Sequence, residues 1–371
     1  IFRCLGLDDD LIAIKIYADN TTYTLEDNYK NKLLRAVHVD HNKVDNFGAT
    51  VHQWYTSSNP NTISFISGSN VAGLEDYLGF TAECKFILPS KPRASEPHYF
   101  RTPFVTSSLF GMNTATDDDQ TDLTYKSVNS ANFSVMVERD SIEGRNAKFR
   151  LSSAEIPLVG APIPELTTSF YNNLYSNTEW SVGVSMRPVK PLGNFVPGSN
   201  EVHATSSATD GRYIVEFFGV NMLGDRVLNE FLLTASISHT VGRSFLRSPK
   251  RMYLGAHYTN FTGTLVNRTD AKFDSLKYYN LYNDTASIKQ HMIDQESYGR
   301  ADSLEQVNLF ASGTLDTYIP KFKTLILNWN FRNLSSSKAD GTFFVDDFSS
   351  GSVADESYGA YKGYFNKQHS G

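Results

Sequence analysis

Three carboxylates stand close enough in the sequence to act together. Glu138, Asp140 and Glu143 form the pattern E-x-D-x-x-E. Hydrolysis of a glycosidic bond with retention needs two carboxyls about 5 Å apart, one as nucleophile and one as proton donor. In a strand, alternation would place Glu138 and Asp140 on one face of the sheet. Glycoside hydrolysis is therefore the first catalytic hypothesis.

The residues around these acids favour a solvated turn instead. Arg139 stands where a buried catalytic strand would carry an apolar side chain, and Gly144 and Asn146 are turn formers. The β-rich runs 135–137 and 148–150 on either side predict a hairpin whose tip carries the acids. A hairpin tip lacks the rigid, apolar cleft that a glycosidase needs around its proton donor. We therefore expect three solvated acids and no hydrolase activity.

Two other patterns suggest metal binding. Asp117–Asp119 with Asp122 could supply oxygens to a calcium ion, but they lack the spacing and the glycine of a dedicated calcium loop. We interpret them as a solvated acidic loop. His38 and His41, three apart, would lie on opposite faces of a strand, so we interpret both as surface histidines. The sequence contains no nucleophile elbow, phosphate loop, dinucleotide fingerprint or zinc-protease motif, so we predict no catalytic residue, metal or cofactor.

Tyrosines are concentrated in two turn-like segments, Tyr171–Tyr175 and Tyr278–Tyr282. Tyrosine has an apolar face and a polar tip, so these residues could stack on sugar rings or pack on a neighbouring subunit. They could equally be strand-edge or core residues. Both interpretations stay open at this point.

Composition excludes several classes of function. The chain has a net charge of -6 and no cluster of Lys and Arg, which argues against a nucleic-acid partner. No apolar run approaches the roughly 20 residues of a membrane-spanning helix. Cys4 and Cys84 are too few for a disulfide framework, and we interpret both as unpaired thiols. The 25 Phe and 20 Tyr, with abundant Asn, Ser and Thr, suit strands and turns.

Strands are expected to position the acids and tyrosines named above, because β-rich runs recur between turn-rich segments along the chain. In Trp180–Met186, apolar residues alternate with small or polar ones, the period of a half-buried strand. Repeated strands without intervening helices predict a sandwich or barrel. The predicted runs are Phe80–Leu88, Phe104–Phe110, Phe133–Val137, Ala147–Leu151, Trp180–Met186, Tyr213–Val220, Phe231–Ser238, Met252–Ala256 and Phe273–Tyr279. The predicted core includes Trp180, Val182, Val184, Leu254 and Leu276.

Helical signals are fewer. Capping residues at 283–285 precede Ile288 and Met292, which are four apart on one helical face, and they predict a helix over Thr285–Ile293. Nearer the start, a strand at Leu11–Tyr17 and a short helix after Thr24 are plausible.

The order of these pieces resembles a laminin-G-like module of the concanavalin A-like lectin-glucanase superfamily. The most specific part is the closing strand and helix, although this sequence inserts about ten residues between Gly263 and Asp274. The resemblance implies an all-β, two-sheet antiparallel jelly-roll sandwich with one short C-terminal helix and flanking β-rich segments. The residues that carry it are Phe80–Glu83, Trp180–Val184, Met252–Gly255, Phe261–Thr264 and Phe273–Asn280.

The resemblance also divides the chain. Residues 1–69 are expected to form an N-terminal segment and entry strand, 70–300 the sandwich, and 301–371 a linker and the start of a further β module. The last expectation rests on Leu325–Phe331 and Asp346–Gly351, which resemble the opening of a second module. The chain is therefore expected to be a piece of a longer repeat array. Ser107–Met112 and Asp347–Gly351 also resemble segments of the long structural proteins of tailed marine phages.

These resemblances imply a non-enzymatic protein on a virion surface or outside the cell. Its partners would be other virion or surface proteins, including sibling chains, and surface glycans. The alternative is a lectin-type, receptor-binding module. A hydrolase is the least favoured alternative. It is retained because the pattern at Glu138 is also similar to that of laminarinase-type glycosidases in this superfamily. A groove lined by aromatics and amides would favour glycan binding, whereas a broad interface between sibling chains would favour a structural role.

Overall fold

The computed structural model describes the chain in segments, all within the compact unit Arg35–Gly371. Several sequence predictions lie outside the described residues: the unpaired thiol of Cys4, the strand at Leu11–Tyr17, the helix after Thr24 and the acids at 117–122. The described residues are 37–53, 79–91, 95, 101–114, 133–153, 163–189, 212–238, 241–242, 245–246, 250–259, 263–295, 324–331, 334–335, 343–349 and 363–366.

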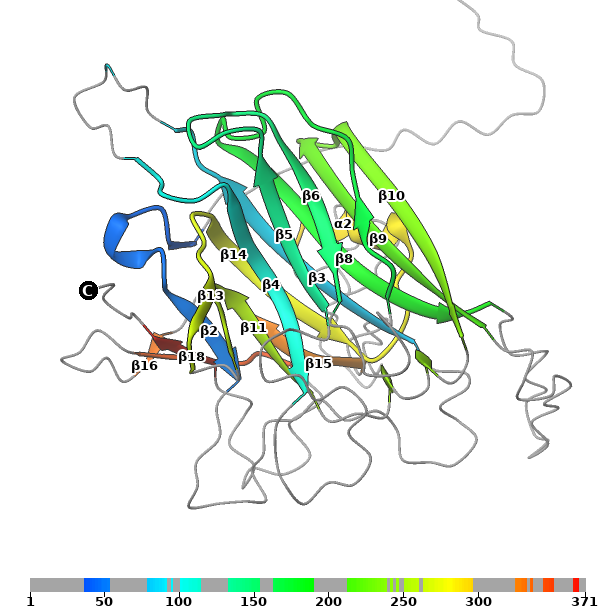
Figure 1. The fold of residues 1–371 in the computed structure, drawn as a ribbon. Coiled ribbons are helices and arrows are strands. Elements are labelled where there is room, and N and C mark those ends of the chain that lie inside the picture. Colours follow the sequence, from blue (N-terminus) through cyan, green and yellow to red (C-terminus); the bar gives the residue numbers. More distant parts are fainter. Residues whose placement is uncertain are drawn as a thin grey trace, which may run out of the picture. The chain divides into compact units, whose positions relative to one another are not determined.

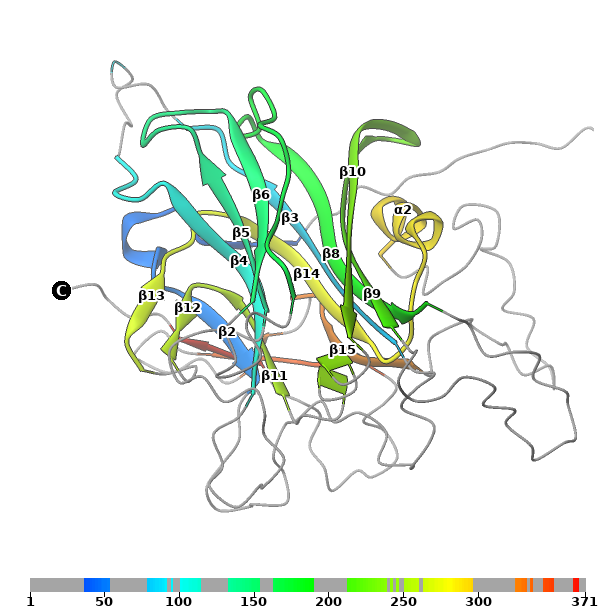
Figure 2. The same cartoon turned by 45° about the vertical axis from the view of Figure 1, so that its right-hand side comes forward.

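Two antiparallel sheets pack face to face (Figures 1 and 2), which confirms the predicted all-β sandwich. The first sheet has the order β1 (Val39–Asp40), β14 (Lys272–Tyr279), β3 (Phe80–Leu88), β8 (Thr178–Pro188), β9 (Arg212–Leu223) and β10 (Arg226–Ser238), and β15 (Leu325–Trp329) also pairs with β14. The second has the order β16 (Leu334–Ser335), β17 (Phe343–Val345), β18 (Gly363–Asn366), β2 (Thr50–Gln53), β11 (Lys250–Gly255), β4 (Thr106–Thr114), β5 (Phe133–Arg139), β6 (Ala147–Ser152) and β7 (Leu166–Thr167). A separate hairpin joins β12 (His257–Tyr258) to β13 (Leu265–Asn267).

The core lies between the inner faces of the two sheets. Each predicted β-rich run overlaps a strand, and the run Phe80–Leu88 coincides with β3. The predicted core residues Trp180, Val182, Val184, Leu254 and Leu276 are all at most 1% exposed. Alternation explains this result, because every second side chain of a strand points to the same face and the apolar set is removed from water.

The helix α2 (Thr285–Ile293) has the predicted bounds. Asp284 caps it, since its side chain accepts a hydrogen bond from the Ser287 N–H at 3.0 Å. Figure 2 shows α2 against the face of the first sheet that points away from the second sheet. There the His291 Nδ1 lies 2.9 Å from Glu83 Oε2, inside the protein. Burial alone would raise the pKa of Glu83, but His291 and Lys277 lower it.

The two sheets include strands from before residue 70 and from after residue 300. On the N-terminal side β2 pairs with β11, and on the C-terminal side β15 pairs with β14 and β18 pairs with β2. The apolar strand at 325–329 pairs along the edge of β14. Pairing there satisfies the backbone groups that an open edge would leave exposed.

Candidate functional site

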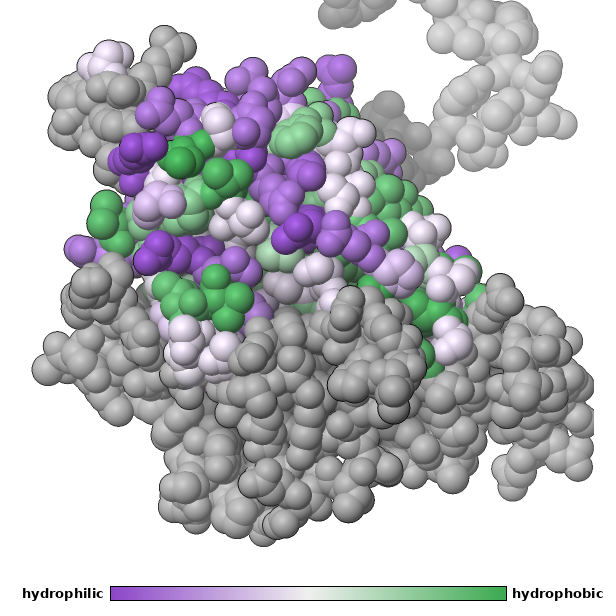
Figure 3. Space-filling view, viewed as in Figure 1, coloured by the Kyte–Doolittle hydropathy of each residue, from purple (hydrophilic) through white to green (hydrophobic). Residues whose placement is uncertain are grey.

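The three acids of the E-x-D-x-x-E pattern lie at the outer end of a hairpin. Glu138 pairs with Lys148 at 3.2 Å and Arg150 at 2.8 Å on the outer face of the second sheet. Asp140 and Glu143 are exposed in the turn between β5 and β6. The Asp140 N–H donates to the Asn146 carbonyl at 3.0 Å, which closes the turn and confirms the predicted hairpin. Hydrophilic side chains are abundant on the upper part of this face (Figure 3).

Arg139 corrects one expectation. We expected this residue to be solvated at the hairpin tip, but it is 3% exposed. It lies two residues after Val137 and four after Val135, so alternation directs it inward. Its guanidinium donates to the Ile142 carbonyl at 2.9 Å and lies 3.9 Å from the Asp270 carboxylate. The charge is therefore inside the sandwich.

Asp270 is the centre of a buried polar cluster with Lys91, Arg139 and Tyr175, called the Asp270 cluster below. Lys91 Nζ lies 2.7 Å from Asp270 Oδ2, and the Tyr175 hydroxyl donates to Oδ1 at 3.0 Å. Burial would raise the pKa of Asp270, but Lys91 and Arg139 lower it. The four residues come from segments far apart in the sequence, so the cluster ties one end of the sandwich together. Its carboxylate is fully buried, which gives it a structural role.

The histidine prediction is half wrong. His38 is exposed as expected, whereas His41 is fully buried and packs edge-on against Phe273 at 5.1 Å. Burial lowers the pKa of His41 to about 3, so the ring is neutral at physiological pH. Within the described segments, no group of three or more His, Cys, Asp or Glu residues is arranged to hold a metal ion.

The two tyrosine-rich segments have different environments. Tyr278 and Tyr279 are buried, and the Tyr282 hydroxyl donates to Glu216 at 2.9 Å. Tyr175 points inward to Asp270, whereas Tyr171 is half-buried at the surface. The segment of Tyr171 therefore contributes to a surface site, and the second segment serves mainly the core.

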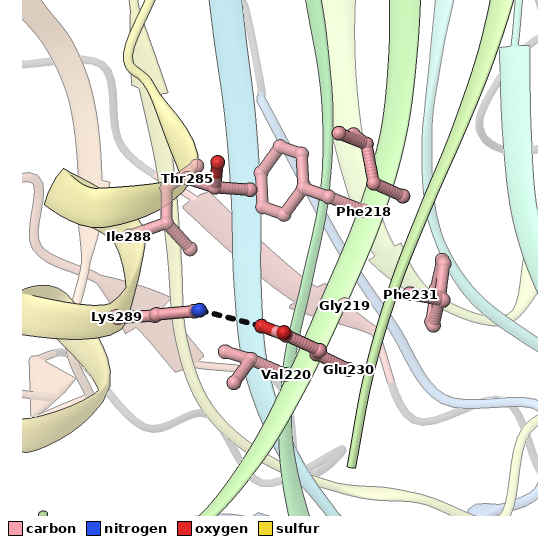
Figure 4. A pocket seen from close by; sticks show the side chains of 9 residues that line it. Phe218, Gly219, Val220, Glu230, Phe231, Thr285, Ile288 and Lys289 are labelled. Carbon is pink, nitrogen blue, oxygen red and sulfur yellow. Dashed lines mark ion pairs between the residues drawn. The ribbon is translucent and has the colours of Figure 1, made fainter. Parts of the chain in front are cut away.

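Two grooves flank the hairpin formed by β9 and β10. The first, called the helix groove, lies between this hairpin and α2 (Figure 4) and has a volume of about 280 Å³. Lys289 of α2 reaches Glu230 of β10 at 2.5 Å. Apart from this ion pair and Thr285, the lining is apolar or glycine. The lining residues are Phe218, Gly219, Val220, Glu230, Phe231, Leu232, Thr285, Ile288 and Lys289.

The second groove, called the amide groove, has a volume of about 300 Å³ and a different lining. A row of side chains crosses three neighbouring strands. Val220 of β9 pairs with Ser181 of β8 in antiparallel register. Its neighbour Asn221 therefore lies opposite Trp180, the residue before Ser181. Asn229 is the register partner of Asn221 on β10. The lining residues are Phe170, Tyr171, Asn172, Leu174, Thr178, Trp180, Asn221 and Asn229.

The other wall of the amide groove is the segment 168–178, which several contacts hold in place. The Tyr171 N–H donates to the Ala147 carbonyl at 2.8 Å, and the Tyr175 N–H donates to the Arg145 carbonyl at 2.9 Å. Asn177 accepts a hydrogen bond from the Ser90 N–H at 2.9 Å and has a positive φ of 57°, which asparagine tolerates in tight turns. The wall is therefore preorganised.

The amide groove offers neutral polar groups beside aromatic surface. Phe170 is 51% exposed, and Asn172 and Asn229 are exposed at the rim. Trp180 is 1% exposed, and its indole N–H has no hydrogen-bond partner in the described part of the chain. The segment of Tyr171 could be identified from the sequence, whereas Asn221 and Asn229 could not, because their meeting depends on the register of β9 and β10.

Comparisons with known proteins give limited information. The sequence matches no protein-family profile and no curated protein. Among solved structures, the CBM2 module of the evolved Dit of Lactobacillus casei BL23 phage J-1 matches with a TM-score of 0.27 and 12% identity, over 59% of this chain and 69% of that one. The binding domain of botulinum neurotoxin serotype G matches with a TM-score of 0.25 and 8% identity, over 60% of this chain and 38% of that one. Likenesses this low support no argument about function.

One further finding concerns membranes. Across the described segments, no helix is long and apolar enough to cross a bilayer.

Proposed function

We propose that this chain is a non-enzymatic recognition module of a virion or extracellular protein, and that its amide groove binds a saccharide. The observation that carries the proposal is that the row Trp180, Asn221 and Asn229 lines one groove together with the exposed ring of Phe170. The resemblance of the sequence to laminin-G-like and concanavalin-like modules agrees with this function.

The chemistry of the groove suits a sugar. Each sugar hydroxyl both donates and accepts hydrogen bonds, and a side-chain amide has both the acceptor and the donor to pair with it. The C–H faces of a pyranose ring are apolar and can lie against an aromatic ring. Binding sites commonly combine an apolar lining with a few placed polar groups. Phe170 and Tyr171 supply the apolar lining, and Asn172 and Asn229 supply the polar groups.

A glycan array probed with the purified chain tests the proposal, followed by titration calorimetry with the bound glycans. Phe170→Ala and Asn229→Ala should each weaken binding, because they remove an exposed stacking surface and a rim amide. Leu232→Ala is the matched control, since Leu232 is 50% exposed on the same strand as Asn229 but lines the helix groove. An array without signal, or equal loss in all three variants, would refute the proposal.

A second function, packing against other proteins, is favoured by β10. This strand of 13 residues pairs with β9 on one side, and no described strand pairs with its other edge. Leu228 and Leu232 on it are 48% and 50% exposed. Long edges without Pro or Lys are prone to pair with another strand. Sedimentation of the wild type and of Leu232→Lys tests this function; it predicts association that the lysine abolishes, and a monomeric wild type would reject self-association.

A further inference from the structure

We infer that the amide groove selects neutral saccharides and discriminates against anionic ones such as sialylated or uronic sugars. The inference rests on the proposed saccharide-binding function and specifies its ligand class. It follows from three features of the groove: the absence of charge in its lining, the balance of its hydrogen-bonding groups, and its size.

Among the residues that the structure describes, none with a charged side chain lines the groove. A cation lies near the rim: the Nζ of Lys148 is 5.5 Å from the centre of the Phe170 ring. This ammonium is already paired with Glu138 at 3.2 Å. An anionic sugar would lose water around its carboxylate or sulfate without gaining a free cation, which is unfavourable. The chain's net charge of -6 adds a further repulsion.

Neutral hydroxyls, in contrast, match the groups that the groove offers. The Asn229 amide is exposed at the rim and can both donate and accept hydrogen bonds. The Thr178 hydroxyl donates to the Leu174 carbonyl, so it offers lone pairs to a ligand. Asn221 is positioned by donating to the Glu179 carbonyl at 2.6 Å. A sugar hydroxyl can accept from the Asn229 amide and donate to the Thr178 oxygen, whereas a carboxylate can only accept.

Size limits the ligand. The volume of about 300 Å³ lies at the lower end of the range for small-molecule sites, roughly 300 to 1,000 Å³. The groove therefore suits one or two sugar rings and not a long polysaccharide laid along the sheet.

Titration calorimetry with matched pairs tests the selectivity. Lactose is compared with sialyllactose, and glucose with glucuronic acid, at low and at physiological salt. We expect the neutral member of each pair to bind at least about tenfold more tightly, and its affinity to change little with salt because no ion pair forms. Phe170→Ala and Asn229→Ala, set against Leu232→Ala, locate any binding in the amide groove.

The outcomes separate the two proposals. Tighter binding of neutral sugars that depends on Phe170 and Asn229 supports both. Equal or tighter binding of the anionic members, with the same dependence on these residues, overturns the selectivity and leaves the saccharide site standing. Absence of binding to any glycan on the array and to all four sugars overturns the saccharide site and the selectivity with it.

Discussion

Replacing Asp270 with alanine should be among the most damaging single changes in this protein. Asp270 is fully buried, Lys91 lies 2.7 Å from its carboxylate, and Arg139 lies 3.9 Å away. The Tyr175 hydroxyl also donates to it. The change would leave two buried cations without their shared counter-charge. Breaking a buried ion pair by removing one partner typically costs about 3 to 5 kcal/mol, and we expect a loss in this range.

Urea unfolding followed by tryptophan fluorescence measures this effect. Glu138→Ala is the matched control, because Glu138 also pairs with two cations but on the outer face, where its side chain is 16% exposed. Ion pairs near the surface contribute about 0 to 1 kcal/mol, so this variant should unfold almost like the wild type. A loss for Asp270→Ala no larger than that for Glu138→Ala would refute the reasoning.

If Asp270→Ala does not fold, Asp270→Asn gives the same information through pH. The pKa of Asp270 is lowered in the folded protein, so its contribution to stability is present above the pKa of the unfolded chain. That contribution is lost as pH falls through the lower, folded value. Asp270→Asn should therefore be less stable than the wild type near neutrality, and the difference should shrink in acid. A difference that is independent of pH would contradict the role of the charge.

Three further predictions follow from other parts of the molecule. Trp180→Ala should reduce the free energy of unfolding by about 3 to 5 kcal/mol, the cost of deleting a large buried aromatic, and a midpoint in urea that barely moves would show that Trp180 does not support the core. The chain should release no reducing ends from laminarin, agarose or carrageenan, because Glu138 is engaged by Lys148 and Arg150; turnover that disappears in Glu138→Gln would promote the hydrolase hypothesis. Burial raises the pKa of Asp347 to about 7, so the protonated carboxyl stabilises the folded state at low pH. This stabilisation is lost as pH rises through about 7. The wild type should lose stability relative to Asp347→Asn as pH rises from about 4 to about 7, measured by thermal unfolding, and parallel pH profiles would contradict this.

The strands could be predicted because alternation is local. The period of two in Trp180–Met186 is visible in the sequence, and the structure confirms both the strand and its buried face. The same rule extended from Val137 would have placed Arg139 inside the sandwich. What misled the prediction was its charge, since a buried arginine needs a partner, and the partner Asp270 lies 131 positions away.

The amide groove could not be predicted in the same way. Asn221 and Asn229 meet because β9 and β10 pair with an irregularity between Val227 and Asn229, and no local pattern specifies that register. Trp180 joins them through a third strand. Composition suggested that aromatics and amides were available, but only the pairing of distant strands brings them to one groove.

The groove and the Asp270 cluster share one element, and this gives the last prediction. Tyr175 belongs to the segment 168–178 that forms one wall of the groove, and its hydroxyl ties that segment to Asp270 at 3.0 Å. Tyr175→Phe keeps the buried ring and removes only this hydrogen bond to a charged group, a loss of about 1.5 to 3 kcal/mol in stability.

The proposed saccharide site adds a second readout to the same variant. A looser wall should weaken sugar binding although no residue that lines the groove has changed, because part of the binding free energy would be spent on ordering the segment. Calorimetry on Tyr175→Phe, with Leu232→Ala as the control outside the amide groove, measures both effects. Unchanged affinity together with reduced stability would show that the hydrogen bonds of Tyr171 to Ala147 and of Ser90 to Asn177 are sufficient to hold the wall.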